Sequence, residues 1–157
     1  MMYLAVLLAL LIAPPAPAWS QPMPPPAPGA WPTWAPGRMM VHVINVGQGN
    51  CVLIQCPAGQ NILVDCGSST TRDSGNVDVA QNYIASALAP TAAANGGTLL
   101  FQTVILTHPD RDHWSMLPEV IPAGAASPYR VNRFLYGGKA MPKAPAGTQS
   151  IAEWARH

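Results

Sequence analysis

A charge-free, proline-rich stretch at the front of the chain confines any folded domain to the residues that follow it. Residues 1–37 carry no charged side chain and hold ten of the 18 prolines in the 157-residue sequence. Proline lacks an amide donor and restricts the residue before it, so residues 14–37 cannot form a helix or a central strand. We expect residues 19–37 to be an extended, partly polyproline linker. Residues 38–157 are then enough for one domain at most.

The first 18 residues have the pattern of a secretory signal peptide. Residues 3–13 form an apolar run that is too short to span a bilayer, for which a helix needs about 20 residues. Ala16-Pro17-Ala18 resembles an A-x-A cleavage site, although no Lys or Arg precedes the run. The pattern predicts a secreted or extracytoplasmic protein, cleaved near Ala18 and without a stable membrane span. An uncleaved apolar tail or a wrongly assigned start is the alternative.

The charge balance argues against a strong nucleic-acid patch. The charged residues make up 10% of the chain and the formal net charge is +1. A basic cluster of Arg130, Arg133, Lys139 and Lys143 occurs late in the chain. This cluster is more simply explained as a solvated face than as an electrostatic footprint.

The three cysteines leave an odd thiol. In an oxidising compartment one disulfide is possible, because a hairpin could bring Cys51 near Cys66 and leave Cys56 unpaired. Reduced thiols in the core are the simpler interpretation, and the spacing matches no zinc-finger pattern.

Alternating strand-like and helix-like stretches predict an α/β layered domain. Strands are expected at residues 39–46, 51–55, 61–65, 98–107 and 131–136, and helices at residues 78–88, 112–117 and 149–157. Ser74 or Asn76 would cap the first helix and Pro90 would end it. Its common face would hold Val79, Tyr83, Ile84, Ala87 and Leu88. His42 is expected on the less buried side of the first strand.

A dense polar cluster follows the strand expected at residues 98–107. His108, Asp110, Asp112 and His113 fall within six residues, directly after the apolar run 103–106. Pro109 cannot continue a strand, so the cluster should form a loop at the strand's carboxyl end. Imidazole nitrogens and carboxylate oxygens together suit a borderline ion such as zinc. We therefore predict a site for one or two zinc ions, with manganese as the alternative metal; an ordinary polar turn is the competing interpretation.

Three stretches resemble one known family. His108-Pro109-Asp110-Arg111-Asp112-His113 resembles the HxHxDH metal motif of the metallo-β-lactamase fold, with Asp110 in the place of the second histidine. The HPDxDH form is similar to the branch that includes the metallohydrolase domain of DNA-uptake competence proteins. Residues 43–50 resemble the opening strand and VGQGD loop of that branch, with Asn50 in the place of Asp. Residues 62–67 resemble the strand that ends in LVDxG.

The resemblance implies an αββα sandwich and a hydrolytic site. His108 would bind a first metal ion, Asp112 and His113 a second, and Asp110 would bind the first ion or act on a proton. Asp65 would accept a hydrogen bond from a ligand histidine and fix its tautomer. The reaction implied is hydrolysis of a phosphodiester or related small-molecule ester by a metal-bound hydroxide, which Asp112 would orient.

The family pattern also requires ligands that this sequence does not offer in the expected places. A further histidine, a bridging aspartate and another histidine should follow the motif, but the single histidine after His113 is His157, in a helix-like segment near Glu153. We therefore expect residues 38–157 to form the first half of the sandwich, with apolar faces left exposed. A non-catalytic secreted binding module or an inactive fragment of the same fold is the alternative.

Overall fold

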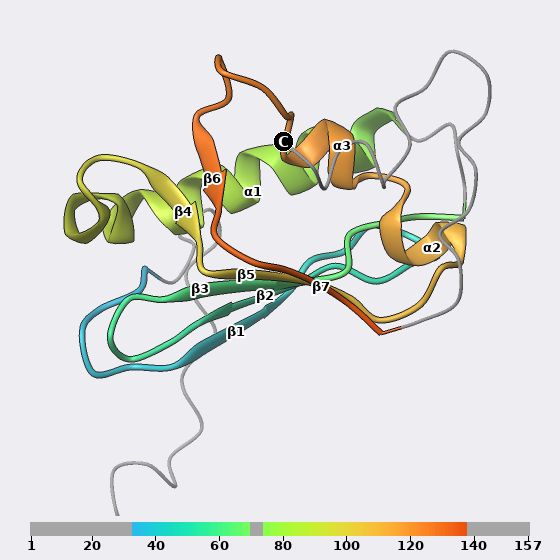
Figure 1. Cartoon of the computed structure of the whole chain (residues 1–157). Helices are drawn as coiled ribbons and strands as arrows, with labels where there is room; N and C mark the ends of the chain where they lie inside the picture. Colours follow the sequence, from blue (N-terminus) through green and yellow to red (C-terminus); the bar gives the residue numbers. More distant parts are fainter. Residues whose placement is uncertain (1–32, 70–73, 138–157) are drawn as a thin grey trace, which may run out of the picture. The chain divides into compact units, whose positions relative to one another are not determined.

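The computed structural model describes residues 33–69 and 74–137. The predicted signal peptide, most of the predicted linker, the helix expected at residues 149–157 and His157 lie outside the described residues. The described part is a mixed α/β fold, with a five-stranded mixed sheet and a two-stranded parallel sheet (Figure 1). The α/β prediction is confirmed at that level.

The strands are β1 (Met40–Val43), β2 (Val52–Gln55), β3 (Asn61–Val64), β4 (Leu99–Phe101), β5 (Thr103–Leu106), β6 (Tyr129–Val131) and β7 (Phe134–Tyr136). The helices are α1 (Ser74–Ala92), the 3₁₀ turn η2 (Ala93–Asn95), α2 (Arg111–Trp114) and α3 (Leu117–Val120).

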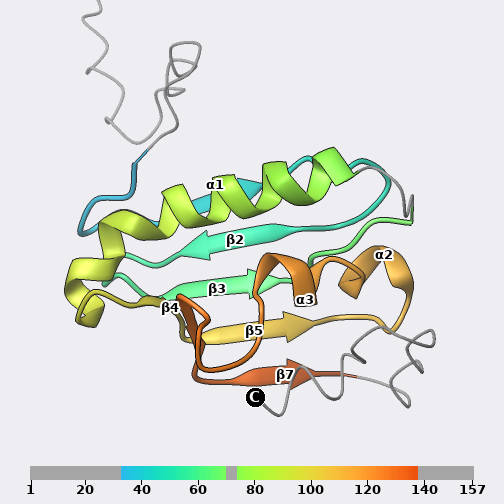
Figure 2. The ribbon, with the colours of Figure 1, turned by 90° about the horizontal axis from the view of Figure 1, so that it is seen from above.

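The larger sheet has the strand order β1-β2-β3-β5-β7. β1, β2 and β3 pair antiparallel, whereas β3, β5 and β7 pair parallel. The three parallel strands therefore end at the same edge of the sheet, and α2 lies at that edge (Figure 2). This edge is where side chains from separate strands can meet.

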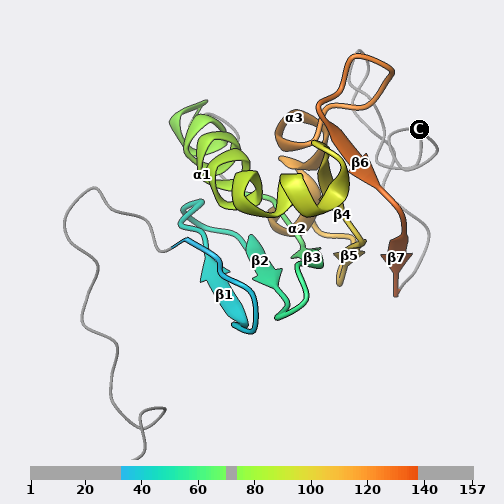
Figure 3. The same ribbon diagram turned by 90° about the vertical axis from the view of Figure 1, so that its left-hand side faces the viewer.

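One face of the larger sheet packs against the helices. The strands contribute the fully buried side chains of Leu53, Leu63, Val104 and Leu106, which meet Ile84 and Leu88 of α1 and Leu117 and Val120 of α3. Figure 3 shows that α1, α2 and α3 all lie on this same side of the sheet. Met116 and Leu117, which follow the site loop, are also in this core.

His42 lies on the buried side of β1, whereas the sequence analysis placed it on the less buried side. His42, Ile44 and Val46 face the core, whereas Val41 and Val43 are exposed. The prediction was wrong because it treated the histidine as the polar residue of an alternating strand, and the apolar residues after the strand set the phase instead.

A buried polar network compensates for placing His42 in the core. Its Nε2 lies 3.0 Å from Oε1 of Gln55, and its Nδ1 lies 2.7 Å from the hydroxyl of Tyr83. Gln55 uses its amide nitrogen to donate to Asn61 and to the carbonyl of Ala87, so its oxygen must face the imidazole. His42 therefore donates from Nε2 and accepts from Tyr83 at Nδ1 as a neutral ring. Burial lowers its pKa, although the bond to Gln55 opposes that change.

The long helix differs from the prediction at both ends. α1 begins at Ser74 and continues through Pro90 to Ala92. Asn76 is inside the helix and donates to the carbonyl of Val46, so it does not cap the helix. Val79, expected on the buried face, is 52% exposed, and Ala80 takes the core position. Pro90 removes one helical hydrogen bond but does not stop the helix.

The strand expected at residues 98–107 is two strands in two different sheets. β4 pairs with β6, β5 pairs with β3 and β7, and Gln102 separates β4 from β5. The strand expected at residues 131–136 divides in the same way, into β6 and β7. Both segments change sheet at the same place. There the amide of Asn132 donates to the carbonyl of Phe101, and the amide of Val104 donates to the carbonyl of Arg133.

Candidate functional site

The predicted site loop lies where the sequence placed it, directly after β5 and leading into α2. It is one of three segments that meet at the carboxyl edge of the parallel strands. The other two are residues 48–50, which precede β2, and residues 65–69, which follow β3. The position of the loop therefore depends on how these three segments bind each other.

Backbone hydrogen bonds join the three segments directly. The amide of Asn50 donates to the carbonyl of Asp112 at 3.0 Å, and the amide of Cys66 donates to the carbonyl of His113 at 2.8 Å. The amide of Met116 in turn donates to the carbonyl of Cys66 at 3.1 Å. These bonds fix the backbone that carries Asp112 and His113 against the ends of β2 and β3.

The glycines of two motifs allow this close approach. A Cβ on Gly67 would lie 2.5 Å from the backbone nitrogen of Trp114 and 2.6 Å from the carbonyl oxygen of Arg111. A Cβ on Gly49 would overlap the carbonyl oxygen of Gly67. Both positions therefore need glycine because another backbone occupies the space that a side chain would fill.

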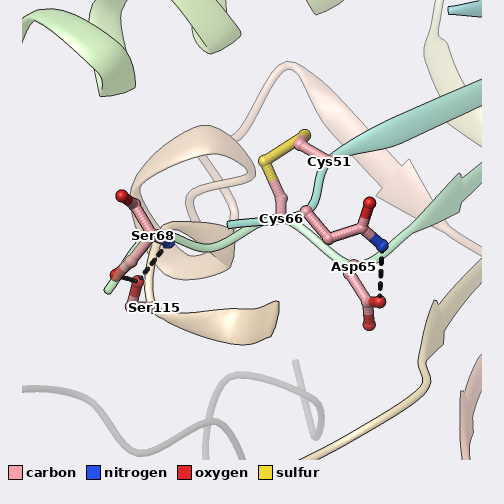
Figure 4. Close-up of a disulfide and its surroundings, with 6 residues drawn as sticks. Cys51, Asp65, Cys66, Ser68 and Ser115 are labelled. Atoms are coloured by element: carbon pink, nitrogen blue, oxygen red, sulfur yellow. Dashed lines mark hydrogen bonds between the residues drawn. A yellow bond between two sulfur atoms is a disulfide. The ribbon is translucent and has the colours of Figure 1, made fainter. Parts of the chain in front are cut away.

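A disulfide between Cys51 and Cys66 joins two of the three segments, and Cys56 is free (Figure 4). The preference for reduced core thiols was wrong for this pair, and the alternative of one bridge with one unpaired thiol is the arrangement present. Next to it, the hydroxyl of Ser115 accepts from the amide of Ser68 and donates to its carbonyl, both at 2.9 Å (Figure 4).

Asp65 is the centre of the hydrogen-bond network at this edge. Its carboxylate is fully buried and accepts from Asn50 Nδ2 at 2.9 Å, from the amide and hydroxyl of Thr107 at 2.8 and 2.6 Å, and from His113 Nδ1 at 2.9 Å. Burial acts to raise the pKa of Asp65, but these hydrogen bonds together hold it below its ordinary value. Asp65 is therefore a buried carboxylate that is ionised and fully paired.

The contact with Asp65 determines which nitrogen of His113 carries a proton. Because a carboxylate can only accept, Nδ1 of His113 must donate. In the neutral ring, Nε2 then carries a lone pair, and it lies 3.7 Å from Oδ2 of Asp112. Two electron-rich atoms therefore face each other at the part-exposed surface of the loop.

The other predicted ligands form a second pair. His108 Nδ1 lies 3.3 Å from Oδ2 of Asp110, and both side chains are more than half exposed. The rings of His108 and His113 have centroids 5.4 Å apart. Within residues 33–69 and 74–137, however, no three His, Cys, Asp or Glu side chains converge as a group that could hold a metal ion. The donor types suit zinc, but the described residues bring them together in pairs.

A surface cavity lies elsewhere in the fold. It has a volume of about 730 Å³ and is lined by residues 121–125, 127, 129–132 and 134. None of the loop residues lines it. We therefore base the candidate site on the loop chemistry and assign the cavity no role in it.

The sequence analysis gave three residues no role in the site. Asn50 and Thr107 both donate to Asp65, and the indole nitrogen of Trp114 donates to the carbonyl of Pro109 at 3.0 Å, which holds the loop back on itself. The only available clue was Asn50, which occupies a position where the resembled motif has Asp. A second carboxylate there would face Asp65, whereas an amide can donate to it.

No protein-family model matches the chain, and no curated protein or solved structure matches it significantly. The motif resemblance to metallo-β-lactamase-fold hydrolases therefore stays a prediction. None of the described helices combines the length and apolar character needed to cross a membrane.

Proposed function

We propose that the chain is an extracytoplasmic metal-dependent hydrolase that acts on a phosphodiester or a related small ester. The loop residues His108, Asp110, Asp112 and His113 would hold one or two zinc ions, or manganese. The Cys51–Cys66 disulfide supports an oxidising location.

The observation that carries the proposal is the position of His113, whose Nδ1 contacts the buried Asp65 while its Nε2 faces Asp112. A histidine that binds a metal usually donates its other ring N–H to a carboxylate, and His113 donates to the buried Asp65. Zinc–ligand bonds are about 2.0–2.2 Å long, so a nitrogen and an oxygen 3.7 Å apart need only a small side-chain movement to share an ion.

The second imidazole is also within reach. With zinc–nitrogen bonds of about 2.0–2.1 Å, two rings on one tetrahedral ion have centres roughly 5 Å apart. The separation between His108 and His113 is 5.4 Å. A third ligand would then come from the exposed loop carboxylates, Asp110 or Asp112.

Each side chain has a distinct part in the proposed chemistry. A bound divalent cation supplies Lewis acidity, which lowers the pKa of water and polarises an ester. Asp65 holds the His113 ring in one tautomer, while Asp112 lies where it can orient a water. Asp110, paired with His108, is more exposed and can take up or release a proton.

An imidazolium explains the same contacts without a metal. With a proton on both ring nitrogens, His113 could donate from Nδ1 to Asp65 and from Nε2 to Asp112. The chain would then be a non-catalytic module. Metal affinity separates the two interpretations, because only the hydrolase proposal requires a cation to bind.

The test is zinc binding to the purified full chain, measured by titration calorimetry after chelator treatment. We expect stoichiometric binding that His113→Ala and Asp112→Asn each weaken by about 10-fold or more. Asp78→Asn, a neutralised aspartate on the exposed side of α1, is the matched control and should bind as the unaltered chain does. Absence of zinc and manganese binding in the unaltered chain would exclude the proposal.

Hydrolysis is tested separately with bis-p-nitrophenyl phosphate. We expect turnover that depends on added metal and is lost in the His113→Ala variant. Metal binding without turnover of this or related esters would leave a metal-binding module and refute the hydrolase.

A further inference from the structure

The second face of the larger sheet is almost entirely apolar. Strand pairing aligns its outward side chains in two rows that cross the sheet. One row is Val41, Ile54, Ile62 and Thr103, and the other is Val43, Val52, Val64, Ile105 and Leu135. Eight of these nine side chains are apolar and none is charged. We call these nine residues the outer sheet face.

No described element covers the outer sheet face. The described helices lie on the opposite side of the sheet (Figure 3). Val43 is 80% exposed, Val41 55% and Leu135 43%, and the residues between them are partly exposed. A continuous apolar patch of this kind on a small protein normally marks an interaction site.

We propose that the outer sheet face binds the same face of a second copy of this chain. Two sheets pack well face to face when both present β-branched and other apolar side chains, and Val and Ile supply seven of the nine residues here. A two-fold axis would place one outer sheet face on the other, so each copy would cover what its partner leaves exposed.

Charge favours a second copy as the occupant. The outer sheet face has no charged residue, so pairing two copies buries no unpaired ion. The net charge of the whole chain is +1, so the copies do not repel each other strongly.

The size of the face suits a modest dimer. Five strands about 4.8 Å apart and four residues long give a face of roughly 24 by 13 Å. Each face then has a flat area of roughly 300 Å², so two paired faces, with the relief of their side chains and their rims, would bury on the order of 1,000 Å², in the range of weak, transient interfaces. A dissociation constant in the micromolar range follows from an interface that is apolar but small.

Sedimentation equilibrium of the full chain from about 1 to about 200 μM tests the proposal in that range. A Cys56→Ser background removes the free thiol, so a covalent link between copies cannot imitate the dimer. We expect a reversible monomer–dimer equilibrium. Val43→Glu, at the most exposed position of the face, should raise the dissociation constant by about 10-fold or more.

The matched control is Val79→Glu. Val79 is also an exposed valine, at 52%, but it lies on α1 and outside the outer sheet face. We expect it to dimerise as the unaltered chain does. Leu135→Glu, on the opposite edge strand, provides a second interface variant in case Val43→Glu fails to fold by circular dichroism.

Three results would overturn the proposal. A chain that stays monomeric at the highest concentration has no such dimer. Equal dissociation constants for both interface variants and the control would place the interface elsewhere. A monomeric chain that floats with phosphatidylcholine vesicles, with flotation lost in Val43→Glu, would assign the face to a lipid surface instead.

Discussion

Asp65 combines a left-handed backbone with a fully buried carboxylate. Its φ of 55° is unusual for a residue other than glycine, although aspartate tolerates that region better than most. The position therefore selects for a small polar side chain, and the four hydrogen bonds around it select for one that only accepts. Backbone and side chain together hold the end of β3 against the site loop.

Replacing Asp65 with asparagine should destabilise the fold. An amide can accept at one oxygen only, so some of the donors from Asn50, Thr107 and His113 would be left unpaired in a buried place. We expect the free energy of unfolding to fall by about 2–4 kcal/mol, measured by urea denaturation at pH 7. Asp78→Asn, at an exposed position on α1, should change it by less than about 0.5 kcal/mol.

His42 should make stability depend on pH near neutrality. Its folded pKa is lowered by burial from the ordinary value of 6.5, so the unfolded chain takes up a proton more readily than the folded chain does. The stabilisation from neutral His42 is complete above that ordinary value and is lost progressively as the pH falls below it towards the folded pKa.

The measurement is the free energy of unfolding between about pH 8 and about pH 5. We expect a decline below about pH 6.5 that His42→Gln reduces, because glutamine does not titrate. His108→Gln, which alters a histidine with 55% of its side chain exposed, should retain the decline. A decline of equal slope in both variants would contradict the assignment to His42.

At the level of elements, the sequence predicted most of the strands because their apolar residues are local signals. It could not predict that residues 98–107 divide between two sheets. Nothing in Gln102 itself marks the change; the break depends on Asn61, whose backbone amide and carbonyl both bond to Gln102 from another strand. Pro90 misled the helix prediction because a proline near the end of a long, well-packed helix is tolerated at a local cost.

The candidate site could be predicted only as a set of residue types. The order of the candidate ligands along the loop is visible in the sequence, and so is an acidic residue at the end of β3. Which donors surround Asp65 depends on the close packing of three segments, and Asn50 and Thr107 carry no local sign of that role. Sequence patterns also could not predict that the loop side chains lie in pairs.

The packing of these segments should be sensitive to a single methyl group. Gly67→Ala would place its Cβ against the backbone of Arg111 and Trp114, which cannot move aside as a flexible side chain could. We expect a loss of more than about 2 kcal/mol in the free energy of unfolding by urea denaturation. Gly137→Ala is the control, since its Cβ would meet nothing within 4 Å, and it should change stability by less than about 0.5 kcal/mol.

For the whole molecule, the disulfide should contribute stability mainly through the unfolded chain. Cys51 and Cys66 are 15 residues apart, and closing a loop of that length removes entropy worth about 3 kcal/mol from the unfolded state. The paired Cys51→Ala and Cys66→Ala variant should therefore lower the thermal midpoint measured by calorimetry. The free Cys56 serves as the control, and an equal drop on Cys56→Ser would show that the bridge is not the cause.

Trp34 is attached to the fold at the turn between β2 and β3. Its indole nitrogen donates to the carbonyls of Arg38 and Cys56, at 3.1 and 2.9 Å, and its ring lies next to Gly59. Trp114 lies at the other end of β3, in α2. Variants that keep one of these two tryptophans as their only indole would report optically on opposite ends of the same strand. Coincident fluorescence transitions would mean that the hairpin and the site loop melt as one cooperative unit, and an earlier transition at Trp114 than at Trp34 would mean that the loop opens first.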